Sequence, residues 1–110
     1  MTATGRPRAI FQRAVSRGNL VVAEVTAREM GRITLLEALD LTALIALKDP
    51  RRRSRVAARW LQRYLDEHPV PTIEDAAFAA SALAALGGAG HDEAVAALGG
   101  LAERISRSAS

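Results

Sequence analysis

Cysteine is absent from this chain of 110 residues, and aromatic residues make up only 4% of it. Without cysteine the protein has no disulfide, no thiolate metal site and no cysteine nucleophile, a composition that fits a reducing cytoplasm. The sequence also lacks any run of about 18 apolar residues, so it predicts no membrane span. We therefore expect a cytoplasmic protein that has no membrane partner.

Side chains that carry chemistry are also scarce. The chain has two histidines, and neither belongs to a metal-binding or catalytic motif. Asp92 and Glu93 follow His91 directly, but adjacent residues of a helix point in different directions, so we expect no metal site there. Glu37 and Asp40 share one side of a predicted helix, and we interpret them as a solvent-facing strip instead of a general acid–base pair. These observations predict a protein that is not an enzyme and has no cofactor.

Apolar residues are plentiful, at 49% of the chain, and most of them are alanine and leucine. This composition predicts a folded all-α protein, because β-branched and aromatic residues, which favour strands, are few. The length is typical of one domain. We expect residues 7–105 to form a single helical domain between two disordered polar tails, residues 1–6 and 106–110.

Capping residues, prolines and glycines divide this domain into six predicted helices. They are expected over residues 7–17, 19–30, 34–48, 50–67, 72–87 and 91–105. Capping boxes are predicted at Thr34 and at Thr72, and the helix that follows Thr34 is apolar on nearly all sides, so it should be the central one. We expect Asp49 to cap the fourth helix with Pro50 at its first position, and Gly99-Gly100 to weaken or split the sixth.

Short turns join these helices in pairs, which predicts three antiparallel helical hairpins. Three hairpins of this length favour a compact bundle of five to six helices. The alternative is a short α-solenoid in which the hairpins stack in a row.

Positive charge is concentrated in the first part of the chain. Residues 1–63 carry 13 basic and 5 acidic side chains, a net charge of +8, whereas residues 64–110 carry 2 and 7, a net charge of −5. The density is highest in the fourth predicted helix, where arginines spaced mainly by four residues would form one ridge. The ridge residues are Arg51, Arg52, Arg55, Arg59 and Arg63.

Three interpretations of this ridge stay open. In the first interpretation the ridge is only a solvated face. The chain has 14 arginines against one lysine and 23 alanines, a composition typical of a GC-rich bacterial genome, so codon usage would explain the excess of arginine. In the second, the ridge is a docking surface for an acidic protein or for the acidic half of a second copy, because guanidinium groups pair well with carboxylates. In the third, it contacts the phosphates of a nucleic acid. We favour a non-enzymatic interaction module that docks through residues 50–67 and is able to self-associate, with a nucleic-acid accessory protein as the alternative.

Two aromatic residues lie one turn apart on the apolar side of the same helix, Trp60 and Tyr64. We interpret them as core residues. The alternative is a hot spot at the edge of the arginine ridge, because Trp and Tyr are enriched in the centres of interfaces.

Overall fold

A computed structural model of the chain describes residues 6–108. Within this range the chain folds into α-helices joined by short turns, and no strand occurs. The helices are α1 (Pro7–Ser16), α2 (Leu20–Met30), α3 (Leu35–Lys48), α4 (Arg53–Glu67), α5 (Ile73–Ala84) and α6 (His91–Ser108). Two 3₁₀ turns, η1 (Pro50–Arg52) and η2 (Ala85–Gly87), precede α4 and follow α5. The predicted all-α class is confirmed. None of the helices in this range is long and apolar enough to cross a membrane.

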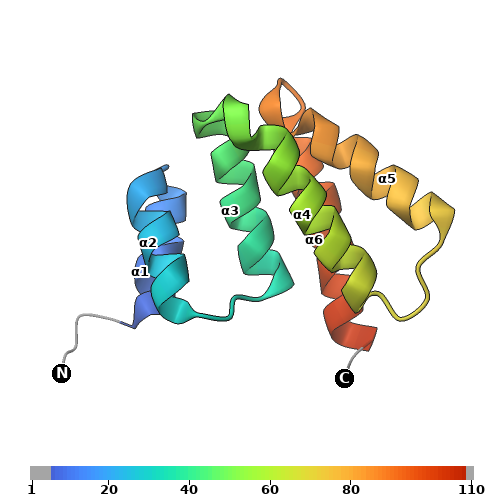
Figure 1. The fold of residues 1–110 in the computed structure, drawn as a ribbon, viewed down its shortest axis with the longest axis horizontal. Coiled ribbons are helices and arrows are strands. Elements are labelled where there is room, and N and C mark those ends of the chain that lie inside the picture. Colours follow the sequence, from blue (N-terminus) through green and yellow to red (C-terminus); the bar gives the residue numbers. More distant parts are fainter. Residues whose placement is uncertain (1–5, 109–110) are drawn as a thin grey trace.

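The helices pair along the chain and assemble into a flattened bundle that measures 46 × 34 × 20 Å. The α1–α2 hairpin forms one end, α3 lies in the middle, and α4, α5 and α6 form the other end (Figure 1). The radius of gyration is 14.0 Å, close to the value of about 13 Å for a compact chain of this length. The compact bundle is therefore the arrangement adopted, and the stacked solenoid is not.

The central position of α3 explains why this helix is apolar on nearly all sides. One side of α3, with Leu39, packs into a large hydrophobic cluster that includes Trp60 of α4 and extends over α5 and α6. Another side, with Leu44, packs into a smaller cluster formed by Phe11 and Ala23 of the α1–α2 hairpin. Burial on both sides removes the polar face that a surface helix has, as the sequence predicted.

Both predicted capping boxes are present. At the start of α3 the Thr34 hydroxyl accepts a hydrogen bond from the Glu37 N–H at 3.0 Å, and the Glu37 carboxylate accepts one from the Thr34 N–H at 2.8 Å. Thr72 and Asp75 exchange the same pair of hydrogen bonds at the start of α5. At the end of α2, Gly31 adopts a φ angle of 75°, which favours glycine because a Cβ atom in this conformation comes too close to the residue's own backbone carbonyl.

The predicted start of the fourth helix is confirmed in its position, since the helical segment begins at Pro50 after Asp49, but its first turn and its cap differ from the prediction. The chain first makes the 3₁₀ turn Pro50–Arg52, and α4 begins at Arg53 without a side-chain cap. The Asp49 carboxylate accepts a hydrogen bond from Arg52 Nε at 2.9 Å and caps no backbone group. Asp49 was predicted to accept a hydrogen bond from a backbone N–H of the helix, but its carboxylate forms an ion pair with Arg52 instead.

The last helix also differs from its prediction. α6 passes through Gly99-Gly100 without a break and continues to Ser108. Leu98 and Leu101 are buried on either side of the two glycines, and this packing outweighs their low helix propensity. Residues 106–108, predicted to belong to a disordered tail, are thus helical. Residues 109–110, and residues 1–5 of the predicted N-terminal tail, lie outside the described range.

Candidate functional site: the arginine side of α4 and its groove

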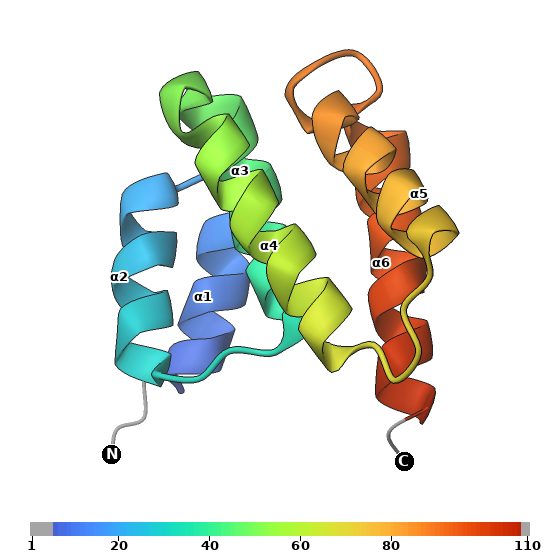
Figure 2. The same ribbon diagram turned by 45° about the vertical axis from the view of Figure 1, so that its right-hand side comes forward.

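The inner side of α4 belongs to the hydrophobic core. α4 lies across α3 (Figure 2), and Trp60 and Tyr64 on its inner side are 2% and 1% exposed. The Trp60 indole N–H donates a hydrogen bond to the Leu35 carbonyl of α3 at 3.0 Å, and its ring stacks on that of Tyr64 with 5.6 Å between centroids. Both aromatics are therefore core residues. Their burial favours the core interpretation over an interface hot spot.

The outer side of α4 does not carry the continuous arginine ridge that the spacing predicts. Arg51 lies in the 3₁₀ turn, where three residues make a turn, and so it does not follow the α-helical register of Arg55 and Arg59. Arg52 and Arg63 are engaged by other parts of the chain. The five predicted arginines thus separate into two with internal roles and three that point to solvent.

Arg52 joins the start of α4 to α2. Its two terminal nitrogens donate to the two carboxylate oxygens of Glu24 at 2.8 and 2.9 Å, and its Nε donates to Asp49. A planar guanidinium held by both oxygens of one carboxylate is the strongest geometry for this pair. Hydrogen bonding to Arg52 is also the main reason that the pKa of Glu24 lies below its ordinary value. Arg52 is therefore a structural residue.

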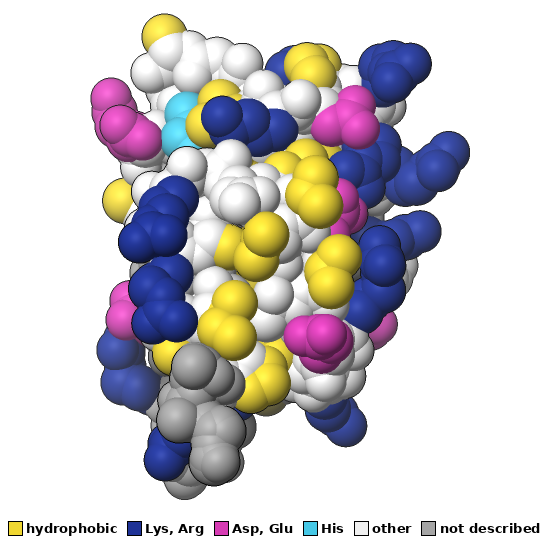
Figure 3. Space-filling model, turned by 90° about the vertical axis from the view of Figure 1, so that its left-hand side faces the viewer, with side chains coloured by type: hydrophobic (Ala, Val, Ile, Leu, Met, Phe, Trp, Pro, Cys, Tyr) yellow, Lys and Arg dark blue, Asp and Glu magenta, His cyan; other side chains and the backbone are white. Residues whose placement is uncertain are grey.

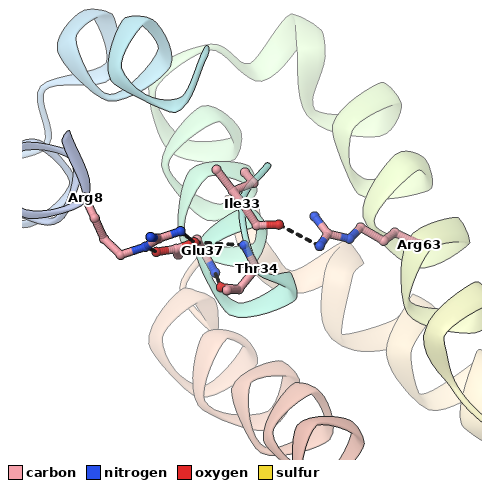
Figure 4. A network of polar contacts seen from close by, with 5 residues as sticks. All are labelled: Arg8, Ile33, Thr34, Glu37 and Arg63. Carbon is pink, nitrogen blue, oxygen red and sulfur yellow. Dashed lines mark hydrogen bonds and ion pairs between the residues drawn. The ribbon is translucent and has the colours of Figure 1, made fainter. Parts of the chain in front are cut away.

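Arg63 joins the end of α4 to the segment between α2 and α3. Its Nη2 donates to the Ile33 carbonyl at 2.6 Å, as Figure 4 shows, and its Nε donates to Glu67 one turn along α4. The Ile33 carbonyl lies between two helices and accepts no helical backbone hydrogen bond. Arg63 therefore satisfies a backbone acceptor that the helices leave unpaired. This role could not be inferred from the spacing, since Ile33 is 30 residues away in the sequence.

The other three arginines are available to a partner. Arg55 and Arg59 are exposed, and neither forms an ion pair or hydrogen bond with any residue in the described range. The Arg51 side chain is 94% exposed, and its one ion pair is a 3.9 Å contact with Asp49, which Arg52 already holds. Arg51, Arg55 and Arg59 therefore form the free arginine set of this surface.

An apolar groove lies beside the free arginine set, between α2 and α4. It has a volume of about 440 Å³. Leu41 and Ile45 of α3 contribute to its floor, and Val56 and Trp60 of α4 contribute to one wall. The groove is open to solvent.

Charged side chains surround this apolar floor. Glu24 lines the groove from α2, and Arg52, Arg59 and Arg63 line it from the side of α4. Glu24 is neutralised by Arg52, and Arg63 is held by Ile33 and Glu67. Arg59 is therefore the lining arginine that has no partner in the described part of the chain. The groove thus combines an apolar floor with net positive charge at its edge.

A second polar network fastens the α1–α2 hairpin to α3. The Glu37 carboxylate accepts hydrogen bonds from Arg8 Nε and Nη2 and from the Thr34 N–H (Figure 4). The Arg8 hydrogen bond is the main cause that lowers the pKa of Glu37 to about 2. Glu37 is 8% exposed, so its predicted place in a solvent-facing strip is wrong. Asp40 is half-buried, and burial raises the pKa of its carboxyl group.

Arg53 has a structural role that the sequence analysis did not identify. Its Nε and Nη2 donate to the Ala46 carbonyl at 3.2 and 3.1 Å. That carbonyl belongs to the last turn of α3, where backbone acceptors lack helical partners and attract cations. The only signal in the sequence is an arginine close to the end of the preceding helix.

The two histidines serve local hydrogen bonds. His68 Nδ1 accepts a hydrogen bond from the Val70 N–H, and its Nε2 lies 3.3 Å from Asp75. His91 Nδ1 contacts the Leu86 carbonyl. Between residues 6 and 108, no three histidine or acidic side chains are placed together to hold a metal ion.

Comparisons with protein-family models, with curated proteins and with solved structures find no match for this chain. The groove and the free arginine set are therefore the features on which a function can be argued.

Proposed function

We propose that this protein is a non-enzymatic interaction module that binds an acidic, amphipathic helix of a partner protein in the groove between α2 and α4. The observation that carries the proposal is an apolar floor beside exposed arginines, of which Arg55 and Arg59 have no ion pair with any residue between 6 and 108. A helix laid in such a groove would place apolar residues on Leu41 and Ile45 and carboxylates beside Arg55 and Arg59.

Two physical arguments support a protein helix as the occupant. Apolar residues at helical spacing gain free energy from leaving water when they cover the groove, and salt does not screen this contribution as it screens charge contacts. Glutamate or aspartate on the flanks gains charge-assisted hydrogen bonds from the free guanidinium groups.

The cysteine-free composition favours the cytoplasm as the place where the module acts.

A nucleic acid is the alternative partner for the same arginines. With Arg52 and Arg63 engaged internally, three free arginines remain for phosphates, which corresponds to weak, salt-sensitive binding. Phosphates and sugars also leave the apolar floor of the groove uncovered. Both features favour the protein helix, and duplex DNA serves as the competing ligand in the test.

The test is a titration that uses the fluorescence of Trp60, the single tryptophan of the chain, which lines the groove. The first ligand is a helical peptide in which leucine and glutamate alternate at helical spacing. The second has serine in place of each leucine, and the third is mixed-sequence duplex DNA. We expect the Leu/Glu peptide to bind most tightly and to shift the Trp60 emission, because it alone covers the groove.

Paired charge reversals locate the binding surface. The variant Arg55→Glu/Arg59→Glu should weaken binding of the Leu/Glu peptide at least about tenfold, which is the loss of about 1.4 kcal/mol for two charge-assisted contacts. The control variant Arg104→Glu/Arg107→Glu changes the net charge equally at exposed positions of α6, and it should bind like the wild type. Tighter binding of DNA than of both peptides would favour the nucleic-acid alternative. Equal binding by both variants would refute the proposed site.

A further inference from the structure

Large hydrophobic side chains are exposed mainly in two patches of the described surface. Three valines on α2 form the first patch: Val21, Val22 and Val25, which are 73%, 38% and 45% exposed. The second group, called here the α5 patch, is spread over α5 and the segment before it, and consists of Val70, Ile73 and Phe78, which are 73%, 88% and 53% exposed. Leu47, at the end of α3, is the one remaining large apolar side chain of residues 6–108 with comparable exposure.

The α2 patch has basic surroundings. Residues 6–32 carry six arginines and two glutamates, a net charge of +4. Figure 3 looks onto the side formed by α1 and α2, where hydrophobic side chains follow the middle of the face and Lys and Arg lie along both edges. Arg13 and Arg17 of this region are exposed, and neither forms an ion pair with the described part of the chain.

The α5 patch has acidic surroundings. No lysine or arginine occurs among residues 64–103, which carry seven acidic side chains. Glu67 is paired with Arg63, and Arg104 of α6 lies near Asp75, so the remaining five carboxylates carry the negative charge of this side. Glu74 is exposed beside Ile73 on the first turn of α5. Phe78 lines a shallow hollow together with Glu93 of α6, so a carboxylate adjoins this exposed aromatic side chain.

The two patches therefore match each other in chemistry and oppose each other in position. α2 and α5 lie at opposite ends of the longest dimension of the bundle (Figure 1). Because the two patches are separated by the length of the bundle, they cannot contact each other within one copy. A second copy can supply the matching patch to each.

We infer that the protein assembles head to tail, with the acidic α5 patch of one copy docked on the basic α2 patch of the next. Apolar side chains would cover each other at the centre, and opposite charges would surround them, which is the usual anatomy of an interface. A contact between two identical patches would instead bring like charges together, which is unfavourable. A heterologous contact of this kind uses a different patch on each copy, so each copy can bind two neighbours and the assembly grows beyond a dimer into a ring or an open chain.

This inference involves surfaces outside the α2–α4 groove, so it stands or fails independently of the proposed function. The experiment measures the weight-average mass by sedimentation over a range of protein concentrations, at about 50 and about 500 mM salt. We expect the mass of the wild type to rise with concentration beyond that of a dimer, and to rise less at the higher salt. A wild type that stays monomeric throughout would overturn the inference.

Two variants that each block one patch distinguish this mode from other assemblies. V21Q/V25Q removes the α2 patch and I73Q/F78Q removes the α5 patch, in both cases at exposed positions where glutamine suits a helix. We expect each variant alone to be monomeric. An equimolar mixture should reach about twice the monomer mass and grow no further, because one intact patch of each kind remains.

The remaining outcomes are equally decisive. A mixture that stays monomeric, or one variant that associates by itself like the wild type, would overturn the head-to-tail contact. Leu47→Gln is the matched control, since it removes an exposed apolar side chain outside both patches and should leave association unchanged. Circular dichroism and the emission of Trp60 confirm that every variant is folded before its mass is interpreted.

Discussion

Replacing Glu37 by glutamine isolates the charge that fastens the α1–α2 hairpin to α3. Glutamine keeps the side-chain oxygen of the capping box with Thr34 but removes the ion pair with Arg8. A pKa lowered from 4.5 to about 2 corresponds to an upper limit of about 3 kcal/mol of stability. Because the Arg8 side chain is 51% exposed, screening by water reduces this to about 1–2 kcal/mol, the loss that we expect at neutral pH.

The pH dependence of this loss follows from the direction of the pKa shift. The pKa of Glu37 is lower in the folded protein than in the unfolded chain, so its contribution is complete well above pH 4.5 and disappears as the pH falls towards 2. At about pH 3, less than about half of the difference between wild type and Glu37→Gln should remain. The two proteins should become equally stable at lower pH.

The assay is urea unfolding of wild type and variant, followed by Trp60 fluorescence, at pH 7 and at pH values down to about 2. Glu29→Gln is the control, because Glu29 is exposed on α2 and its change should alter stability by less than about 0.5 kcal/mol. If Glu37→Gln is as stable as the wild type at pH 7, or if its deficit is the same at all pH values, the ion pair does not hold the hairpin.

Three further substitutions test the packing of the core and of the turns. Trp60→Phe removes the donor to the buried Leu35 carbonyl and should cost about 1–3 kcal/mol in urea unfolding followed by circular dichroism; a cost near zero would contradict that hydrogen bond. Gly100→Ala adds a Cβ that has no neighbouring atom within 4 Å, and it should raise the free energy of unfolding by about 0.5–1 kcal/mol because alanine favours a helix. The melting temperature should rise accordingly, and a lower melting temperature would show that the helix needs glycine there. A Cβ at Gly87 would lie 2.1 Å from Arg53 Cζ, so Gly87→Ala should displace that guanidinium from its carbonyl and cost about 1 kcal/mol. In an Arg53→Ala background the cost should vanish, and a cost that persists would place the clash elsewhere.

The elements that were predicted correctly depend on residues close together in the sequence. Each capping box joins a threonine to an acidic residue three positions later, and both partners are visible in one short segment. The central place of α3 follows from the same kind of evidence, since a helix without a polar side must be covered on all sides. The errors at Asp49 and at Gly99-Gly100 arose where tertiary contacts outweighed a local preference.

The candidate site shows the opposite dependence. Spacing placed all five arginines on one helix, but it did not show which of them were already engaged. Arg52 is paired with Glu24, which is 28 residues away, and Arg63 with Ile33, which is 30 residues away. Glu37 and Arg8, 29 residues apart, form the third such contact. No local pattern specifies partners at these distances.

The sequence by itself determined the all-α class, the order of the helices, their capping boxes and the division of charge between the two halves of the chain. It did so because helix starts and ends, amphipathic periodicity and net charge are properties of neighbouring residues. Only the tertiary structure decided that Arg51, Arg55 and Arg59 stay exposed, that a groove opens beside Arg59, and that the two apolar patches lie at opposite ends. These features depend on how α1–α2 packs against α3 and α4, and packing brings together residues that the chain keeps far apart.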